Sequence, residues 1–462
     1  MTRTRARTRT RRSTTPVATM MNPWRQIQLL VAVSACYSIA TTGTGTSTGS
    51  TMVDAFSLSP APTSASSSPS STLSMTFLSS MDDLTFETPD VVSAGIEEQA
   101  CIDAASKMKR MAVPVPADVS PNGSVGISYI HWPAESSPLK KKMPPLILLH
   151  GFDSSGLEYR RLGPKLAAAG VDTYAVDVLG WGYTQIDEPG QSFSAQSKIT
   201  ALQSFAETLL KNNRSSDKFC VAGASLGGAA AIELAYASKE SCAGLVLIDA
   251  QGFVDGVGPM ALLPTPLAKA GVAFLKSVPL RNSANQMSYY DVDTYATEEA
   301  QMIGRLHCLR PGWSDAMVNF MQSGGFKPSS KVSQITSPSL VLWGREDGIL
   351  DGAEFANKFV ETLPDADLTW IEECGHVPHL EQPDRTCSAI VDFLSSKKVT
   401  LAVDGTYMTP LVGAAVAGGG ADATSSTSEE QEEGDEAGPS PYVVGGGFLG
   451  ALFLEEVIKT LF

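Results

Sequence analysis

The feature that most restricts the fold of this chain is the pentapeptide Gly-Ala-Ser-Leu-Gly at 223–227. A short apolar run with strand character precedes it, and an alanine-rich run with helical character follows it. A tight turn from a strand into a helix strains the backbone, so the residues two before and two after the apex must be small. Gly223 and Gly227 hold these positions around Ser225. The sequence therefore predicts a strand–turn–helix unit with Ser225 at its apex.

Short apolar runs alternate with helical runs through the middle of the chain. Near-continuous apolar strands that alternate with amphipathic helices indicate a parallel sheet covered by helices on both faces. We expect strands at 125–131, 146–150, 173–178, 219–223, 244–248, 340–343 and 368–372. We expect helices at 157–169, 194–211, 226–237 and 385–395. The predicted fold class is α/β with a mostly parallel, doubly wound sheet.

The alternation is interrupted between 249 and 340, where helical patterns continue with few strand signals. An insertion at the carboxyl edge of a parallel sheet would cover an active site as a cap. We therefore expect a folded domain at 110–398 with a helical cap at about 255–335.

The composition of residues 1–100 predicts a targeting presequence and a Ser/Thr/Pro-rich linker. Arginines crowd the start, and the apolar run at 29–40 has the length of a signal-peptide core, too short for a comfortable membrane span. The Ala-Phe junction at 55–56 resembles that of bipartite presequences in algae with complex plastids. Plastid import is the prediction. The alternatives are a secretory signal peptide with a Ser-rich linker, or translation from the second or third methionine.

Residues 400–462 are first Gly/Ala-rich, then acidic, and end in an apolar segment. The first two stretches predict a flexible linker. The final amphipathic segment either contacts a membrane peripherally or packs on its own domain or a partner subunit, and Glu455 and Glu456 favour packing. The net charge of −15 argues against nucleic acid as a partner, because phosphate binding needs clustered Lys and Arg. The oligomeric state is left open.

The seven cysteines lack any C-x-x-C or paired spacing: Cys36, Cys101, Cys220, Cys242, Cys308, Cys374 and Cys387. This usage indicates separate reduced thiols rather than a disulfide framework or a zinc site. Neither a metal nor an organic cofactor is predicted.

Ser225 is the candidate nucleophile, and a serine hydroxyl needs a base that a carboxylate orients. When the serine stands on a strand–helix turn, the acid and then the histidine follow it along the chain. The strand at 340–343 leads into a loop with Asp347, and the strand at 368–372 leads into a loop with His376. We therefore predict His376 as general base and Asp347 as the orienting acid.

Each partner has neighbours that compete for its role. Glu346 and Asp351 flank the acid, and the pattern Trp-Gly-x-x-Asp favours the predicted aspartate. His379 competes with the predicted histidine, but the pattern Gly-His-Val-Pro leaves His379 a structural or rim role. The Cys374 thiol beside the histidine is interpreted as a spectator.

An oxyanion hole needs two backbone N–H donors aimed at the developing charge. Leu226, directly after the nucleophile, is predicted to supply one. Phe152, in the loop after the strand at 146–150, is predicted to supply the other, with Gly151 allowing close approach. His150 is expected to brace this loop.

Five motifs occur in order: His-Gly-Phe at 150–152, Asp-Val-Leu-Gly-Trp-Gly-Tyr-Thr at 177–184, Gly-Ala-Ser-Leu-Gly-Gly at 223–228, Trp-Gly-Arg-Glu-Asp at 343–347, and Gly-His-Val-Pro-His-Leu-Glu-Gln-Pro at 375–383. Over about 125–396 the chain resembles the α/β-hydrolase superfamily, AB hydrolase-1 type, in the branch with a helical cap. That branch includes epoxide hydrolases, haloalkane dehalogenases, esterases and C–C hydrolases. The segment 285–308 is similar to plastid hydrolases of plants and algae, among whose relatives are chlorophyll- and pheophytin-dephytylating esterases.

The resemblance implies acyl chemistry, because a serine stands where epoxide hydrolases and dehalogenases have an aspartate nucleophile. A small-molecule ester is the expected substrate. Cap residues suggest that it is apolar, as an acyl, phytyl or aryl ester: Met260, Leu262, Leu263, Phe274, Met287, Phe320 and Met321. Core packing of the cap explains the same residues equally well. A C–C hydrolase, a thioesterase, a haloperoxidase or lyase, or a small-molecule receptor without turnover would keep the same three residues.

Overall fold

The computed structural model describes residues 86–135, 143–212 and 216–409. Residues 1–85 of the predicted presequence and residues 410–462 of the predicted C-terminal segment lie outside the described residues. The described chain forms an eight-stranded sheet in the order β1-β2-β4-β3-β5-β6-β7-β8. The first strand pairs are antiparallel: β1 (Met108–Pro114) with β2 (Ser124–Trp132), and β2 with β4 (Thr173–Val176). The other strands pair in parallel: β3 (Leu146–Leu149), β5 (Phe219–Ala224), β6 (Cys242–Ile248), β7 (Ser339–Gly344) and β8 (Ala366–Ile371).

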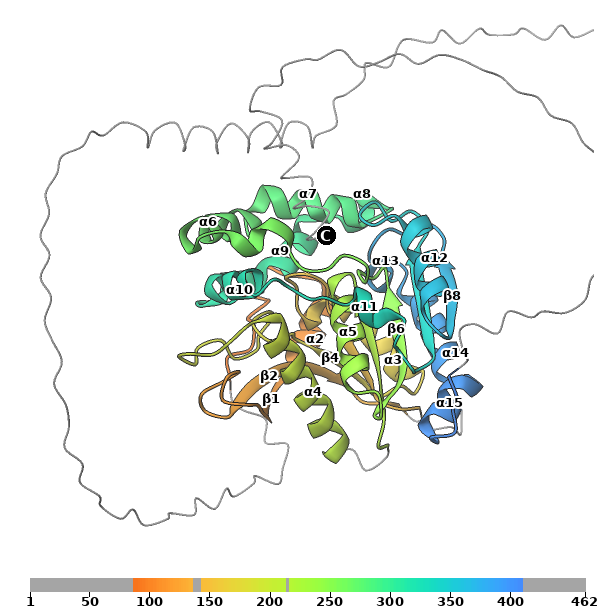
Figure 1. The fold of residues 1–462 in the computed structure, drawn as a ribbon. Helices are drawn as coiled ribbons and strands as arrows, with labels where there is room; N and C mark the ends of the chain where they lie inside the picture. The colour runs from red at the N-terminus through yellow and green to blue at the C-terminus, as the bar shows by residue number, and fades with distance from the viewer. Residues whose placement is uncertain (1–85, 136–142, 213–215, 410–462) are drawn as a thin grey trace, which may run out of the picture. The chain divides into compact units, whose positions relative to one another are not determined.

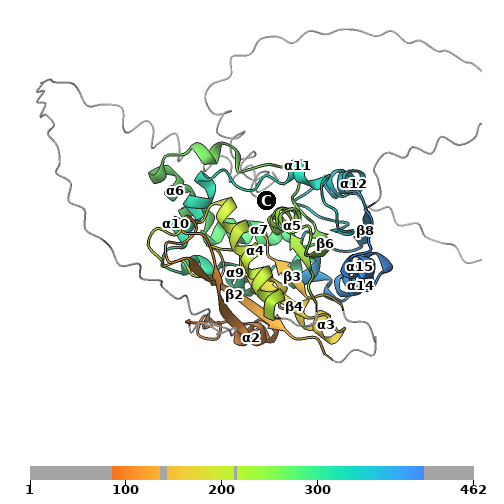
Figure 2. The same ribbon diagram turned by 60° about the horizontal axis from the view of Figure 1, so that its bottom comes forward.

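Helices cover both faces of the sheet, as the apolar strands require. One face carries α4 (Ala195–Asn212), α5 (Leu226–Ala237) and α12 (Gly352–Thr362). The opposite face carries α2 (Gln99–Ser106), α3 (Gly163–Ala168), α14 (Pro383–Leu394) and α15 (Lys397–Val403) (Figures 1 and 2). Successive side chains of a strand point to opposite faces of the sheet. In β3, Ile147 belongs to the core under α4, α5 and α12, and Leu148 belongs to the core on the opposite face. The predicted α/β class with a mostly parallel, doubly wound sheet is therefore confirmed.

The described fold extends beyond the expected limits of 110 and 398. Val91 and Ile96 are buried in the same core as α2, which precedes residue 110. At the other end, Val399 and Ala402 of α15 are buried there too. The edge strand β1 also escaped the sequence analysis, because its alternating exposed positions interrupt the apolar pattern.

The interval between β6 and β7 consists of helices: η2 (Gly258–Leu262), α6 (Thr265–Leu275), α7 (Val278–Ser288), α8 (Val292–Tyr295), α9 (Glu298–Arg305), η3 (Leu306–Leu309), α10 (Trp313–Gln322) and α11 (Ser329–Val332). We call this segment the helical insertion. Its helices α6, α7 and α8 run across the top of the molecule in Figure 1. Within the described ranges, no helix has the length and apolarity needed to cross a bilayer.

Candidate active site

The turn between β5 and α5 has the geometry of a sharp strand–helix corner. Ser225 adopts φ 52° and ψ −123°, a conformation that residues with a side chain rarely adopt. A Cβ on Gly223 would lie 2.1 Å from the carbonyl oxygen of Gly227, and a Cβ on Gly227 would lie 2.3 Å from the Leu149 carbonyl oxygen. Both positions around the serine therefore accept glycine alone without a backbone shift.

His376 and Asp347 are brought together from the loops after β8 and β7. His376 Nδ1 lies 2.8 Å from Asp347 Oδ2, while Asp347 Oδ1 accepts hydrogen bonds from the N–H groups of Ile349 (2.8 Å) and Leu350 (3.0 Å). Burial alone would raise the pKa of Asp347, but His376 and these donors lower it below its ordinary value. Because Nδ1 faces the carboxylate, Nε2 is the ring nitrogen left for chemistry.

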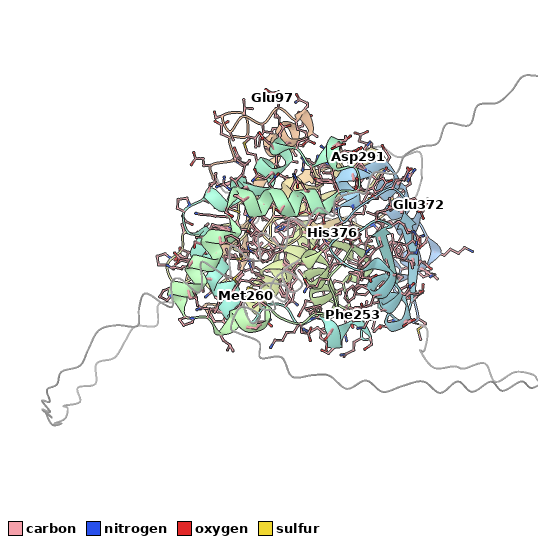
Figure 3. All side chains as sticks on the ribbon, turned by 90° about the horizontal axis from the view of Figure 1, so that it is seen from above. Glu97, Phe253, Met260, Asp291, Glu372 and His376 are labelled. Carbon is pink, nitrogen blue, oxygen red and sulfur yellow. The ribbon has the colours of Figure 1, made fainter. Side chains whose placement is uncertain are left out.

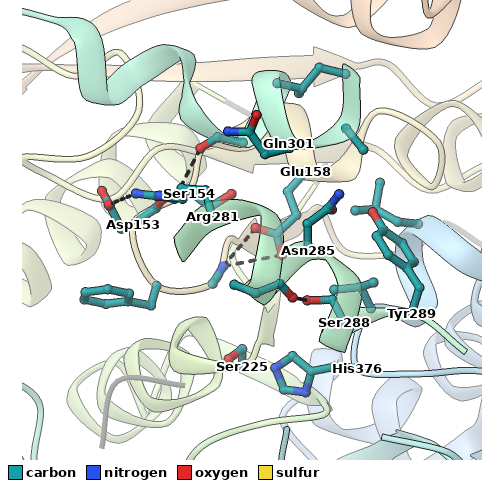
Figure 4. A pocket seen from close by; sticks show the side chains of 18 of the residues that line it. Asp153, Ser154, Glu158, Ser225, Arg281, Asn285, Ser288, Tyr289, Gln301 and His376 are labelled. Atoms are coloured by element: carbon teal, nitrogen blue, oxygen red, sulfur yellow. Dashed lines mark hydrogen bonds and ion pairs between the residues drawn. The ribbon is translucent and has the colours of Figure 1, made fainter. Parts of the chain in front are cut away.

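Ser225 and His376 line one cavity of about 170 Å³, and their side chains lie next to each other at its floor (Figure 4). Phe152, one predicted oxyanion donor, lines the same cavity. Leu226, the other, is the first residue of α5 and is buried directly behind the serine. The predicted site residues thus meet at the carboxyl ends of β3, β5, β7 and β8, which come from distant parts of the chain.

The competing residues have other partners. Glu346 accepts a hydrogen bond from the Cys374 N–H at 2.9 Å, and Asp351 caps α12 by accepting from the Glu354 N–H at 3.1 Å. His379 is fully buried, with Nε2 2.9 Å from Glu158 Oε1. Burial raises the pKa of the Cys374 thiol far above its ordinary value, so the thiol stays protonated.

His150 contacts the loop after β3 through both ring nitrogens. Its Nε2 accepts a hydrogen bond from the Val178 N–H at 3.0 Å, so the proton of the neutral ring is on Nδ1. That nitrogen donates to the Gly151 carbonyl oxygen at 2.9 Å. Burial lowers the pKa of His150, which keeps the ring neutral and this arrangement intact.

The wall of the cavity is more polar than the sequence suggested. Its polar side chains come from the loop after β3, from η1 (Gly156–Tyr159) and its end, and from the insertion: Ser154, Glu158, Arg160, Arg281, Asn285, Ser288 and Gln301. Its apolar side chains are Phe152, Ile303, Ile349, Val377 and Leu380. Burial would raise the pKa of Glu158, yet its close contact with His379 helps lower it to about 2, so a carboxylate lines the same cavity as the nucleophile.

The apolar insertion residues do not line this cavity. Met260, Phe320 and Met321 are buried in the core, whereas Leu262 is 87% exposed at the surface. Figure 3 shows Met260 well away from His376. These residues therefore do not bear on the substrate, and an apolar ester stays a prediction.

A buried polar network joins the insertion to the loop that carries Phe152. Asp153 is fully buried with φ 48°, and its carboxylate accepts from Arg281, from Trp313 Nε1 at 2.8 Å and from His307 Nε2 at 2.9 Å. Burial would lower the pKa of His307, but Cys308 and Asp153 raise it to about 9. Sequence analysis missed Asp153 and Arg281, because no local pattern pairs residues so far apart.

Two groups among the described residues bring three metal-ligating atoms within 4.8 Å of one another. The first is Asp153, His307 and Cys308, and the second is Asp249, Asp347 and His376. In the first group the Arg281 guanidinium already balances the carboxylate. In the second group the histidine nitrogen and the Asp347 oxygen bind each other. Asp249, the third member of that group, accepts a hydrogen bond from the Gly344 N–H through Oδ1.

The strand order and the strand–helix corner after β5 define the α/β-hydrolase fold. The model of the alpha/beta hydrolase family matches residues 146–389, and the chain belongs to this family. It is 37% identical over 253 residues to the alpha/beta hydrolase domain-containing protein VTE7 of Arabidopsis thaliana, covering 55% of this chain and 74% of that protein.

The chain is also similar, at lower sequence identity, to proteins named as other kinds of hydrolase. A 2-hydroxy-6-oxononadienedioate/2-hydroxy-6-oxononatrienedioate hydrolase of Burkholderia vietnamiensis is 27% identical, with 54% of this chain and 86% of that protein covered. Among solved structures, an esterase of Thermogutta terrifontis superposes with a TM-score of 0.50 at 21% identity, covering 63% of this chain and 98% of that one. This structural similarity extends to the fold alone.

Proposed function

We propose that this protein is a serine hydrolase that cleaves carboxylic esters through Ser225, His376 and Asp347. The observation that carries the proposal is the placement of His376, which is bound to a carboxylate through Nδ1 and lies beside Ser225 in one cavity. That arrangement supplies a base for the hydroxyl and a charge that stabilises the base once it is protonated.

The reaction proceeds in two acyl-transfer steps. Ser225 Oγ attacks the ester carbonyl carbon while His376 Nε2 takes its proton, and the Phe152 and Leu226 N–H groups stabilise the oxyanion. Collapse of the intermediate transfers that proton to the leaving alcohol and leaves the acyl group on the serine. Water then attacks the acyl-enzyme, His376 accepts its proton, and the acid leaves as the proton returns to Ser225. Asp347 stabilises the imidazolium in both steps.

The contacts of His150 support Phe152 as a donor. The Gly151 carbonyl is held by His150, and in a trans peptide the following N–H points the opposite way from that carbonyl. The Phe152 N–H therefore points away from His150. A Cβ on Gly151 would lie 3.5 Å from the Ser225 Cβ, so this peptide passes close to the nucleophile.

The size of the cavity supports a small acyl group. Its volume of about 170 Å³ is below the roughly 300–1,000 Å³ typical of ligand pockets. A long hydrocarbon chain cannot be enclosed in this conformation of the protein. We infer that the acyl group occupies the cavity next to Ser225 and that a larger alcohol group extends outside it.

C–C bond hydrolysis is the second candidate. Several relatives at 24–27% identity are named as hydrolases of 2-hydroxy-6-oxo acids. The Asn285 and Gln301 amide side chains on the cavity wall can hydrogen-bond the oxygen atoms of such a substrate. Direct assay of a 2-hydroxy-6-oxo dienoic acid beside an ester separates the two activities.

Labelling of the full-length protein with a fluorophosphonate probe tests the proposal, together with turnover of p-nitrophenyl esters of increasing chain length. We expect labelling that Ser225→Ala abolishes, and turnover that falls as the acyl chain lengthens. Asp347→Asn should lower kcat by about 10²–10⁴, whereas the neighbouring Glu346→Gln should leave it within about threefold. Labelling that survives in Ser225→Ala, or a folded wild-type protein that is never labelled, would contradict the proposal.

We also propose import into a plastid. The composition of residues 1–100 and the relative in a plant support it. Fluorescence of a fusion that carries residues 1–85 should coincide with plastid fluorescence in an algal cell, and a secretory distribution would contradict the proposal.

A further inference from the structure

Asp249 is a buried carboxyl group that the proposed reaction does not use. It follows β6, the strand between β5 and β7, so it lies between the strand ends that lead to Ser225 and Asp347. The residue is 0% exposed, and its φ of 43° is one that residues with a side chain rarely adopt. Such a conformation persists only where the surrounding structure holds it, and functional sites are where it concentrates.

One oxygen of Asp249 is bound and the other is not. Its Oδ1 accepts a hydrogen bond from the Gly344 N–H at 2.9 Å. Its Oδ2 is buried and has no hydrogen-bond partner among the described residues. One carboxylate oxygen of Asp249 lies within 4.8 Å of both an oxygen of Asp347 and a ring nitrogen of His376. An acidic proton on Oδ2 would turn this unpaired atom into a donor beside Asp347.

The charges around Asp249 determine which acid holds a proton. The Asp347 and Glu381 carboxylates face it and oppose a second negative charge, while the nearby Cys374 thiol is protonated and neutral. His376 is the nearby base, and it is bound to Asp347. Burial raises the pKa of Asp249 far above its ordinary value and the Asp347 carboxylate raises it further, while the pKa of Asp347 is lowered. Two carboxyl groups this close in a dry interior share one negative charge, which belongs to Asp347.

We propose that Asp249 is a positioning residue, a neutral carboxylic acid that donates a hydrogen bond from Oδ2 to Asp347 and holds that carboxylate against His376. The inference rests on the proposed roles of Ser225, His376 and Asp347. Because Asp249 also lies close to His376, it has a second capacity, which is to replace Asp347 as the orienting carboxylate. When Asp347 is replaced by a neutral residue, Asp249 releases its proton to solvent and becomes the carboxylate that orients His376.

The protonation state is tested without any substrate. We expect the infrared difference spectrum between the full-length wild-type protein and Asp249→Asn at neutral pH to contain the C=O stretch of a protonated carboxyl group. Carboxylate bands in its place would overturn the proposal. This result stands whether or not the protein hydrolyses esters, so it separates failure of this inference from failure of the proposed function.

The positioning role is tested by ester turnover. Asparagine at 249 can accept from the Gly344 N–H and donate to Asp347, so Asp249→Asn should keep kcat within about threefold. Asp249→Val removes both contacts and should lower kcat by at least about tenfold, with thermal unfolding measured alongside. Equal losses in the two variants would contradict a role that depends on the hydrogen bond.

The second capacity is tested in the Asp347→Asn background. Activity of the Asp347→Asn variant depends on ionisation of Asp249. The acidic limb of the pH–activity profile of this variant should therefore lie at higher pH than that of the wild-type protein. Adding Asp249→Asn should lower the remaining activity by at least a further tenfold or so and remove that limb. Identical profiles for the single and double variants would overturn the second capacity.

Discussion

At the scale of single residues, the site depends on close approaches that leave little choice of side chain. The turn around Ser225 passes against the end of β3, where a Cβ on Gly227 would be 2.3 Å from the Leu149 carbonyl oxygen. Gly228 is equally restricted, since a Cβ there would lie 2.3 Å from the Ala250 Cβ. The sequence pattern alone predicts small residues at Gly223 and Gly227, because the strain of this corner is local.

Replacement of Gly227 by alanine tests this restriction. The added methyl group meets backbone atoms, so we expect the free energy of unfolding to fall by about 2 kcal/mol or more and ester turnover to fall with it. The control is Gly271→Ala in α6, where a Cβ would meet nothing within 4 Å. Urea unfolding of both variants measures the difference, and equal stability of the two would contradict the geometry.

At the scale of elements, buried polar side chains attach the helical insertion to the loops that carry the site. Glu381, in α13 (Pro378–Glu381), accepts hydrogen bonds from the Gly375 N–H (2.7 Å) and the Asp291 N–H (2.7 Å). His376 in turn donates its backbone N–H to the Ser288 carbonyl oxygen at 2.8 Å. The loop after β8 is therefore held by the end of α7 and the chain that follows it.

Glu381→Ala removes the acceptor for these backbone N–H groups. A buried donor left without a partner costs about 1–3 kcal/mol, so we expect a loss of at least about 2 kcal/mol in the free energy of unfolding. Amide exchange at Gly375 and Asp291 should accelerate, and kcat should fall because His376 is less well held. Unchanged exchange at both amides would show that other contacts hold the loop.

The Asp153 network predicts a dependence of stability on pH. His307 has a folded-state pKa of about 9, above its ordinary 6.5, because Cys308 and Asp153 outweigh its burial. The contribution of protonated His307 to the free energy of unfolding is therefore complete below pH 6.5 and is lost as pH rises through 9. This contribution is on the order of 3 kcal/mol.

The measurement is the difference in the free energy of unfolding between the wild-type protein and His307→Gln from pH 6 to pH 9.5. We expect a large difference at pH 6 that shrinks toward pH 9.5. A difference that stays constant over this range would mean that His307 does not titrate there.

At the scale of the whole molecule, the second core reaches beyond the limits expected from the sequence. Ile96 and α2 pack into it from one end of the described chain, and α15 packs into it from the other. A protein cut to 110–398 would lose both contributions and the start of β1. Both ends of the described range are therefore part of the folded unit.

A pair of truncated proteins tests this statement. We expect residues 86–409 to unfold cooperatively, and residues 110–398 to be less stable by several kcal/mol, because each buried apolar side chain contributes about 1.5–3 kcal/mol. Thermal unfolding followed by circular dichroism compares them. Equal midpoints would contradict the packing of the two ends.

Features that have local causes could be predicted from the amino-acid sequence. Strand and helix periods, the small residues around Ser225, and the order of Ser225, Asp347 and His376 follow from neighbouring residues, and they were sufficient for the fold class. The edge strand β1 was missed, because exposed positions break its apolar pattern.

Contacts between residues far apart in the chain became known from the three-dimensional fold. It placed Asp249 beside Asp347, set Glu158 and Arg281 on the cavity wall, and buried Met260, Phe320 and Met321 in the core. Sheet order and loop paths bring these groups together, and local sequence patterns do not encode either of them. For the same physical reason the polarity of the cavity followed from the fold and not from composition.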